Sequence, residues 1–234
     1  MARGVRDEAP RTGGAATRRV VTGEASGELD VKRSRFVARL APAVTPAEAR
    51  GFWLELRRRL PDARHHAVAW RVEEAGRLSE HASDDGEPAG TAGRPILAAL
   101  RQHGLEQAVL VVSRHFGGIL LGAPGLVRAY RQAAELAIAR APLVRLVARP
   151  AWELEVSYAL WEPLQALARR AGATLESPRY GERVRSLLLL PPVGGEALLE
   201  RLREMGPPPP ALRPLGSLWR PEPGDVPPQP VSSG

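Results

Sequence analysis

Two glycine-rich polar segments contain the residues whose types and spacing could do chemistry. Residues 83–93 read Ser-Asp-Asp-Gly-Glu-Pro-Ala-Gly-Thr-Ala-Gly, with three carboxylates and no apolar side chain larger than proline. Residues 114–122 read Arg-His-Phe-Gly-Gly-Ile-Leu-Leu-Gly and follow a strongly apolar run. Because glycine costs backbone entropy, its repeated use predicts positive φ angles or close approach of a partner. We expect the two segments to fold against each other at one recognition surface.

The acidic segment could hold a hard cation or supply acid–base groups. Asp84, Asp85 and Glu87 offer the oxygen ligands that Mg²⁺ prefers, and His66 or His81 could lie nearby. The competing interpretation is a solvated turn whose carboxylates cap backbone amides, a common use of Asp-Gly. The spacing of the acids does not match an EF-hand loop. The sequence assigns no metal, cofactor or catalytic residue, and it does not decide whether the protein is an enzyme.

The glycine segment could bind an anion. Gly117, Gly118 and Gly122 could present amides to a phosphate at the start of the following helix, with Arg114 as a bidentate cation. No Gly-Lys-Ser/Thr follows, and the chain has no G-x-G-x-x-G, so neither common phosphate motif is present. Turn geometry explains the glycines equally well.

The histidines and hydroxyls near these segments give weaker signals. His65 and His66 occupy adjacent positions of an expected strand and therefore point to opposite faces, so they cannot form a paired metal site. Ser83 and Thr91 lack a nucleophile elbow, which leaves a hydrolytic triad without support.

The composition limits the class of protein. The chain has 234 residues, 44% of them hydrophobic, and no cysteine, which excludes disulfides, thiolate metal ligands and a cysteine nucleophile. The net charge is +7, which favours polyanionic partners such as RNA, although Lys32 is the single lysine and such an excess of arginine is also typical of GC-rich coding. No apolar run approaches twenty residues and no signal peptide is recognisable, so we expect a cytoplasmic protein that does not span a membrane.

Composition also predicts the domain boundaries. We expect a disordered N-terminus over residues 1–17, domains over 18–149 and 151–220, and a disordered tail over 221–234. The sequence leaves the oligomeric state open.

The first domain is expected to be a sheet covered by helices. Thr45-Pro46-Ala47-Glu48 combines a capping residue, a proline and a capping box, and predicts the start of a helix. The other expected helices are Arg94–His103 and Pro124–Arg140. The expected strands are Arg18–Ala25, Leu29–Leu40, His65–Val72, Ala108–Ser113 and Leu143–Ala148, with a turn at Ser26-Gly27 and a polar loop before Arg94.

The second domain is expected to have the order β-α-β-β-α-β, which is the ferredoxin-like arrangement. Its expected elements are Trp152–Tyr158, Glu162–Ala171, Thr174–Tyr180, Arg183–Leu190, Gly195–Met205 and Leu212–Trp219. The fold class expected for the whole chain is therefore α+β.

Several motifs, in order, resemble the YigZ/IMPACT family of two-domain bacterial proteins. They are Ala63-Arg64-His65-His66, Ser83 to Gly93, Arg114 to Gly122 and Gly125 to Tyr130, together with Lys32 to Phe36 as a strand. The resemblance implies that the first domain has the left-handed β-α-β fold of a ribosomal protein and of elongation factor G domain IV. It implies a second domain like domain V of that factor.

The resemblance also implies a role in translation, because eukaryotic relatives regulate a kinase of translation initiation. We therefore expect a regulatory protein that contacts RNA, the ribosome or a translation regulator. The alternative is a metal- or phosphate-dependent enzyme or ligand-binding protein. The residues expected to bind a ligand or partner are His66, Ser83, Asp84, Asp85, Glu87, Gly90, Thr91, Arg114, Phe116, Gly117, Gly118, Gly122 and Arg128.

Overall fold

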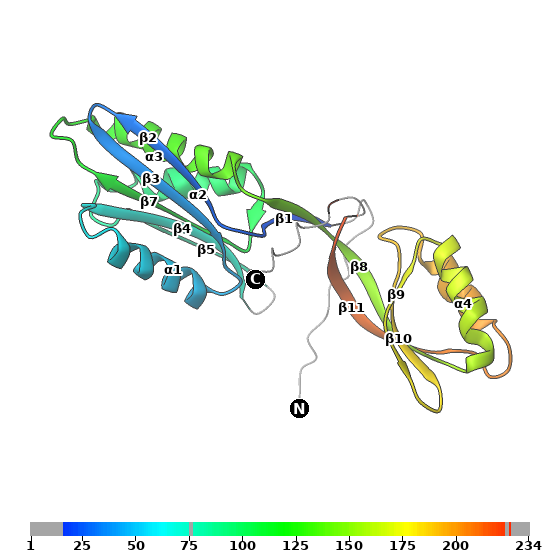
Figure 1. Ribbon diagram of the computed structural model, residues 1–234. Coiled ribbons are helices and arrows are strands. Elements are labelled where there is room, and N and C mark those ends of the chain that lie inside the picture. The colour runs from blue at the N-terminus through cyan, green and yellow to red at the C-terminus, as the bar shows by residue number, and fades with distance from the viewer. Residues whose placement is uncertain (1–15, 75–76, 223–224, 226–234) are drawn as a thin grey trace, which may run out of the picture. The chain divides into compact units, whose positions relative to one another are not determined.

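The computed structural model describes residues 16–74, 77–222 and 225. They form a mixed α+β structure with two compact units, Arg18–Arg145 and Leu146–Arg220 (Figure 1). The expected disordered ends, 1–17 and 221–234, fall almost wholly outside the described residues. None of the described helices is long and apolar enough to cross a membrane.

The first unit is built on a five-stranded sheet with the order β2-β3-β7-β4-β5, in which every neighbouring pair is antiparallel. A short parallel pair, β1 with β6, lies outside this sheet. The strands are β1 (Thr17–Val21), β2 (Ala25–Val31), β3 (Ser34–Pro42), β4 (His65–Glu74), β5 (Arg77–Ser83), β6 (Leu105–Glu106) and β7 (Ala108–His115).

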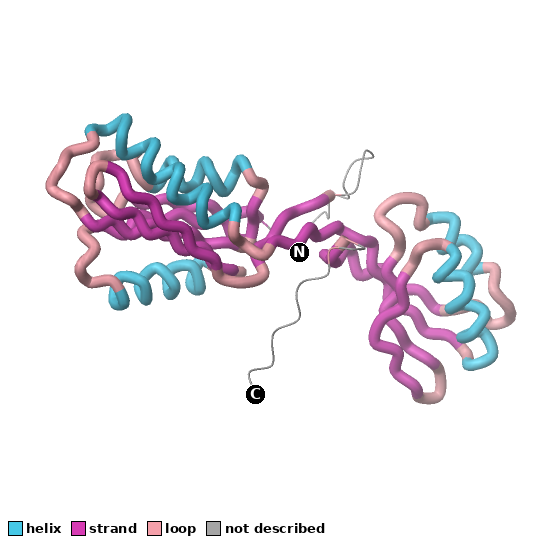
Figure 2. The backbone as a smooth tube through the Cα atoms, turned by 45° about the horizontal axis from the view of Figure 1, so that its top comes forward, coloured by secondary structure: helices cyan, strands magenta, loops and turns pink. Residues whose placement is uncertain are grey.

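Helices cover both faces of this sheet. Helix α1 (Pro46–Arg59) lies on one face, and α2 (Gly93–Gln102) and α3 (Gly122–Ala139) lie on the other (Figure 2). The central strand β7 is therefore apolar from Ala108 to Val112, because its alternate residues enter different cores. Val109 and Val111 pack in the core with α1, whereas Leu110 and Val112 pack in the core with α2 and α3.

The strand register brings four connections to one end of the sheet. His65 of β4 pairs with Arg114 of β7, Arg35 of β3 pairs with His115, and Val68 of β4 pairs with Ser83 at the end of β5. The β2–β3 turn, the α1–β4 connection, the β5–α2 loop and the β7–α3 loop therefore all lie at this end. The two glycine-rich segments are the last two of these connections.

The predicted turn at Ser26-Gly27 is wrong. Both residues lie inside β2, and the hairpin turns instead at Lys32 and Arg33, whose φ angles are 45° and 66°. Gly27 serves packing, because a Cβ there would lie 2.6 Å from the backbone nitrogen of Ala137 in α3. The expected single strand Leu29–Leu40, which included Lys32 to Phe36, is thus two strands.

The residues expected to form a polar loop contain a strand. The segment Arg77–Ser83 forms β5, an edge strand that pairs with β4 along its length. Its sequence is polar because it is half exposed, and Trp70 of β4 stacks on His81 with ring centroids 4.0 Å apart. The two-residue strand β6 was also missed.

The second unit has the predicted element order. It comprises β8 (Leu143–Val156, from Leu146 in this unit), α4 (Tyr158–Arg170), β9 (Thr174–Tyr180), β10 (Val184–Leu189), α5 (Glu196–Arg203) and β11 (Ala211–Pro221). Its strands pair as β11-β8-β10-β9, with apolar residues of β8 and β10 packed against both helices. The two strands expected at Leu143–Ala148 and Trp152–Tyr158 are one continuous strand, β8, which continues through Pro150.

Candidate functional site

Asp84 folds the acidic loop onto the start of α2. Its Oδ2 accepts a hydrogen bond from the amide of Gly90 at 2.7 Å, and its Oδ1 accepts from Ala92 and Gly93 at 3.0 and 2.8 Å. Burial acts to raise the pKa of the Asp84 carboxyl, but these three amide donors outweigh it and the pKa is lowered. Asp84 is therefore a capping group supplied from upstream of the helix.

Asp85 ties the loop to α1 and β4. Its backbone adopts a left-handed φ of 47°. Its Oδ1 accepts from Arg57 of α1 at 2.8 Å, and its Oδ2 accepts from the backbone amide of His66 at 2.7 Å. Its carbonyl oxygen lies 2.8 Å from Nδ1 of His65. Both carboxylate oxygens of Asp85 are thus occupied by donors of the protein.

Glu87 is the buried member of the acidic set. Its Oε1 accepts from the guanidinium of Arg114 at 2.8 Å and from the hydroxyl of Tyr130 at 2.7 Å. The side chains of Glu87 and Arg114 are only 3% and 7% exposed. Burial and the neighbouring Glu87 raise the pKa of Tyr130 far above its ordinary value, so the hydroxyl stays protonated and donates. This trio joins the loop to β7 and α3.

Arg114 also joins the two glycine-rich segments. A second guanidinium nitrogen reaches Ser34 Oγ at 3.4 Å, and the same oxygen accepts from the amide of Gly117 at 3.3 Å. The guanidinium lies 5.5 Å from the ring centre of Phe36 and 5.3 Å from that of Phe116. The structure therefore brings the acidic loop and the glycine segment together through Arg114. In this structure the guanidinium of Arg114 is buried and paired with Glu87.

Gly117 is required by close packing of the β2–β3 turn. A Cβ on Gly117 would lie 2.0 Å from the carbonyl oxygen of Arg33. Gly118 and Gly122 have φ angles of 85° and 69°, a region that favours glycine. Backbone geometry thus accounts for the spacing of these three glycines.

His66 lies on the other face of the sheet from Arg114. Its Nδ1 is 2.8 Å from the hydroxyl of Ser113, and Trp53 of α1 donates to its carbonyl oxygen at 2.7 Å. Burial lowers the pKa of His66, which favours the neutral ring. The prediction that His65 and His66 face opposite sides is confirmed. His66 therefore lies beside α1, whereas Glu87, which pairs with Arg114, contacts Tyr130 of α3.

The acidic loop does not form a metal centre. Among the residues that the structure describes, no group of three histidine, aspartate or glutamate side chains could hold a metal ion. The hydrogen bonds above explain why, because each carboxylate of the loop already faces cationic or amide donors.

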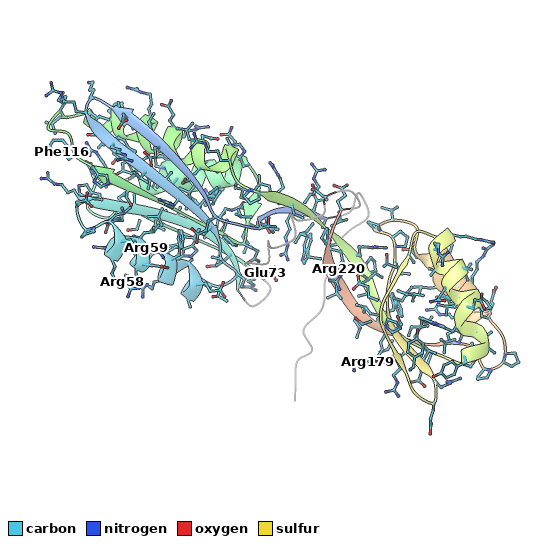
Figure 3. All side chains as sticks on the ribbon, in the orientation of Figure 1. Arg58, Arg59, Glu73, Phe116, Arg179 and Arg220 are labelled. Atoms are coloured by element: carbon cyan, nitrogen blue, oxygen red, sulfur yellow. The ribbon has the colours of Figure 1, made fainter. Side chains whose placement is uncertain are left out.

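The remaining predicted residues divide into loop and surface positions. The Thr91 hydroxyl donates to the carbonyl of Pro88 at 2.7 Å, and Ser83 Oγ accepts from the Asp85 amide at 3.3 Å. Gly90 has a φ of 76° and donates to Asp84. Arg128, on the second turn of α3, is exposed. Phe116 lies at the loop end of the first unit (Figure 3).

Sequence reasoning missed the partners of the acidic residues. Ser34 and Ser113 are polar residues of strands β3 and β7, and both are fully buried. Such positions signal a hydrogen-bonded role. Tyr130 and Arg57 sit on helices far away in the sequence, so nothing local assigned them to the loop.

Comparison with known proteins finds a family match in each half of this chain. Residues 32–138 match the Impact N-terminal domain, and residues 154–206 match a domain of unknown function, DUF1949. An IMPACT family member of Haemophilus influenzae is 35% identical over 180 residues, 76% of this chain and 86% of the relative. The chain belongs to the IMPACT family. A Thermus thermophilus member is 42% identical over 71% of this chain and 88% of its own length.

Other members of the family extend the comparison. IMPACT family member YigZ of Escherichia coli is 38% identical over 64% of this chain and 74% of its own length. The human protein IMPACT is 35% identical over 95 residues, 29% of its length. A crystal structure titled only as a hypothetical protein shares 31% identity and a TM-score of 0.56, covering 84% of this chain and 96% of the other. The first family match spans both glycine-rich segments.

Proposed function

We propose that this IMPACT family chain is a binding and regulatory protein linked to translation, which contacts RNA, the ribosome or a protein regulator of translation. One observation favours this proposal over an enzymatic function. Asp84, Asp85 and Glu87 each use their carboxylates to bind donors of the protein itself. A group committed to several internal hydrogen bonds is a poor acid, base or metal ligand.

In this proposal the acidic loop is a scaffold for the connections beside it. Glu87 and Arg114 fix the ends of β5 and β7, and Gly117 lets the β2–β3 turn pack closely. The residues that contact a partner are then the exposed ones that this scaffold holds in place. Of the residues expected from the sequence, these are Gly118, Gly122 and Arg128, with Phe116 at their edge.

We assign the two domains to 18–149 and 151–220, with folds of translation-factor type. In the second unit, the pairing order β11-β8-β10-β9 supports a ferredoxin-like domain. In the first unit, the resemblance to elongation factor G domain IV supports a ribosomal-protein-like domain. These types suit contact with RNA or ribosomal protein by analogy alone.

Ribosome co-sedimentation tests the proposal. The purified chain is expected to pellet with ribosomes at about 50 mM salt and to be released by about 200 mM, since phosphate contacts weaken steeply with salt. Replacing Arg33, Arg64 and Arg128 with alanine together should abolish pelleting. A matched variant lacking Arg50, Arg58 and Arg59 of α1 removes the same charge elsewhere and should pellet normally. Equal pelleting of both variants would argue against contact through this end of the sheet, and no association of the wild-type chain would contradict the ribosomal form of the proposal.

A further inference from the structure

The β7–α3 loop exposes an apolar tip on a fixed backbone. Leu120 is 82% exposed and Ile119 is 39% exposed. Leu121, the next residue, packs against the core formed with α2 and α3 and anchors the loop from within. The tip is therefore held outward by an ordered structure, and exposed apolar groups held in this way mark interaction sites.

Three cations lie at the same end of the sheet. Lys32 and Arg33 form the exposed β2–β3 turn, which packs against Gly117 at the base of the loop. Arg64 is exposed and its guanidinium lies 5.2 Å from the ring centre of Phe116. Among the described residues, the ion pairs at this end of the sheet are formed by other side chains. None of these three cations therefore has a carboxylate partner there.

Asp30 and Asp62 are exposed acids at this end of the sheet. Asp62 lies 3.3 Å from Nδ1 of His115, and Asp30 is opposite Arg35 in the strand register, although the guanidinium of Arg35 pairs with Glu28. Because Lys32, Arg33 and Arg64 outnumber these two acids, the surface is positive and complementary to a negative one.

We propose that Lys32, Arg33, Arg64, Ile119 and Leu120, the loop-end surface, form a docking site for an acidic amphipathic protein segment. Leu120 enters an apolar face of the segment, and the three cations meet its carboxylates. This inference rests on the proposed function, of which it names the partner chemistry. An apolar centre with a charged rim is the usual anatomy of a protein interface.

RNA fits this surface less well than a protein segment does. Recognition of unpaired bases uses aromatic rings free to stack. Phe116 is the aromatic residue at this surface, and its ring already contacts the guanidiniums of Arg64 and Arg114. A protruding leucine has no stacking surface, whereas it fills an apolar pocket of a protein.

Photo-crosslinking in the cells that produce the protein tests the proposal. A photoreactive phenylalanine analogue is placed at Ile119 of the full chain, and in a control at Leu54 of α1, which is also an exposed apolar position. The adduct is then treated with ribonuclease or with protease, and the attached segment is sequenced. A synthetic peptide of that sequence is titrated into wild-type chain, Leu120→Ser and Lys32→Glu/Arg33→Glu.

We expect a ribonuclease-resistant adduct from position 119 and not from 54, with acidic and apolar residues alternating in the attached segment. Peptide affinity should fall about tenfold in each variant, the loss expected when a buried leucine or paired charges are removed. An RNA adduct, an adduct with a second copy of this chain, a segment without acids, or no adduct above the control would overturn the docking site. Co-sedimentation of the wild-type chain with ribosomes tests the proposed function separately from the docking site.

Discussion

Removing the Glu87 carboxylate should strongly destabilise the first unit. Glu87 accepts hydrogen bonds from Arg114 at 2.8 Å and from Tyr130 at 2.7 Å, and its side chain is 3% exposed. In Glu87→Ala the Arg114 charge stays buried without its carboxylate, which costs about 3–5 kcal/mol. The Tyr130 hydroxyl also loses its acceptor, at about 1–3 kcal/mol, although the two losses overlap. We expect a net loss near 4 kcal/mol, a large part of the roughly 5–15 kcal/mol that stabilises a domain.

Denaturant unfolding of the full chain measures this loss. The control Glu55→Ala removes an exposed carboxylate that pairs with Arg59 and should cost at most about 1 kcal/mol. The variant Glu87→Leu/Arg114→Met/Tyr130→Phe removes the whole polar trio and should recover most of the stability, because no buried charge is left unpaired. A loss below about 1 kcal/mol in Glu87→Ala would refute the scaffold role of this residue.

Three further outcomes follow from the same geometry. Gly117→Ala places a Cβ 2.0 Å from a backbone oxygen and should cost about 1–3 kcal/mol in denaturant unfolding, whereas Gly51→Ala has open space and should be neutral or stabilising. Equal effects of the two would contradict the close packing. Asp84→Asn should cost about 1 kcal/mol at pH 7. Because the folded pKa of Asp84 is lowered, its contribution is present above the unfolded value of about 4 and is lost as pH falls through the folded pKa, so the difference between Asp84→Asn and wild type should shrink at acidic pH. Adding Mg²⁺ or EDTA should leave the melting temperature within about 1 °C, because the carboxylates of the acidic loop already accept hydrogen bonds within the protein, and a clear rise with Mg²⁺ would indicate a bound ion instead.

Local signals predicted the elements whose ends are fixed by neighbouring residues. The start of α1 is the clearest case. Thr45 Oγ1 accepts from the amide of Glu48 at 3.2 Å, and the Glu48 carboxylate accepts from the amide of Val44 at 2.9 Å. The element order of the second unit was predicted as well, since glycines mark the ends of its helices and alternating apolar residues mark its strands.

Prediction failed where a residue's role depends on a distant segment. Gly27 reads as a turn residue, but it lies in a strand because α3 passes over it. The true turn is formed by Lys32 and Arg33 at positive φ. No glycine or asparagine stands at these positions to indicate a turn in the sequence. The polar strand β5 lacks the apolar alternation of a half-buried strand.

The candidate site shows the same division. The glycines and acids of the two segments were predicted to matter, and the structure brings the segments together. Their use as scaffold could not be predicted, because the donors to Asp85 and Glu87 come from Arg57, Arg114 and Tyr130 on three other elements. A carboxylate has the same sequence signature whether it binds a metal or an arginine.

Ribosome co-sedimentation of Glu87→Leu/Arg114→Met/Tyr130→Phe tests the central claim most directly. This variant keeps the shape of the buried trio and removes all of its polar chemistry. If the trio only holds the neighbouring loops in place, the folded variant will pellet with ribosomes as the wild-type chain does, with the same salt dependence. A variant that stays folded but no longer pellets would show that these groups act on the partner themselves.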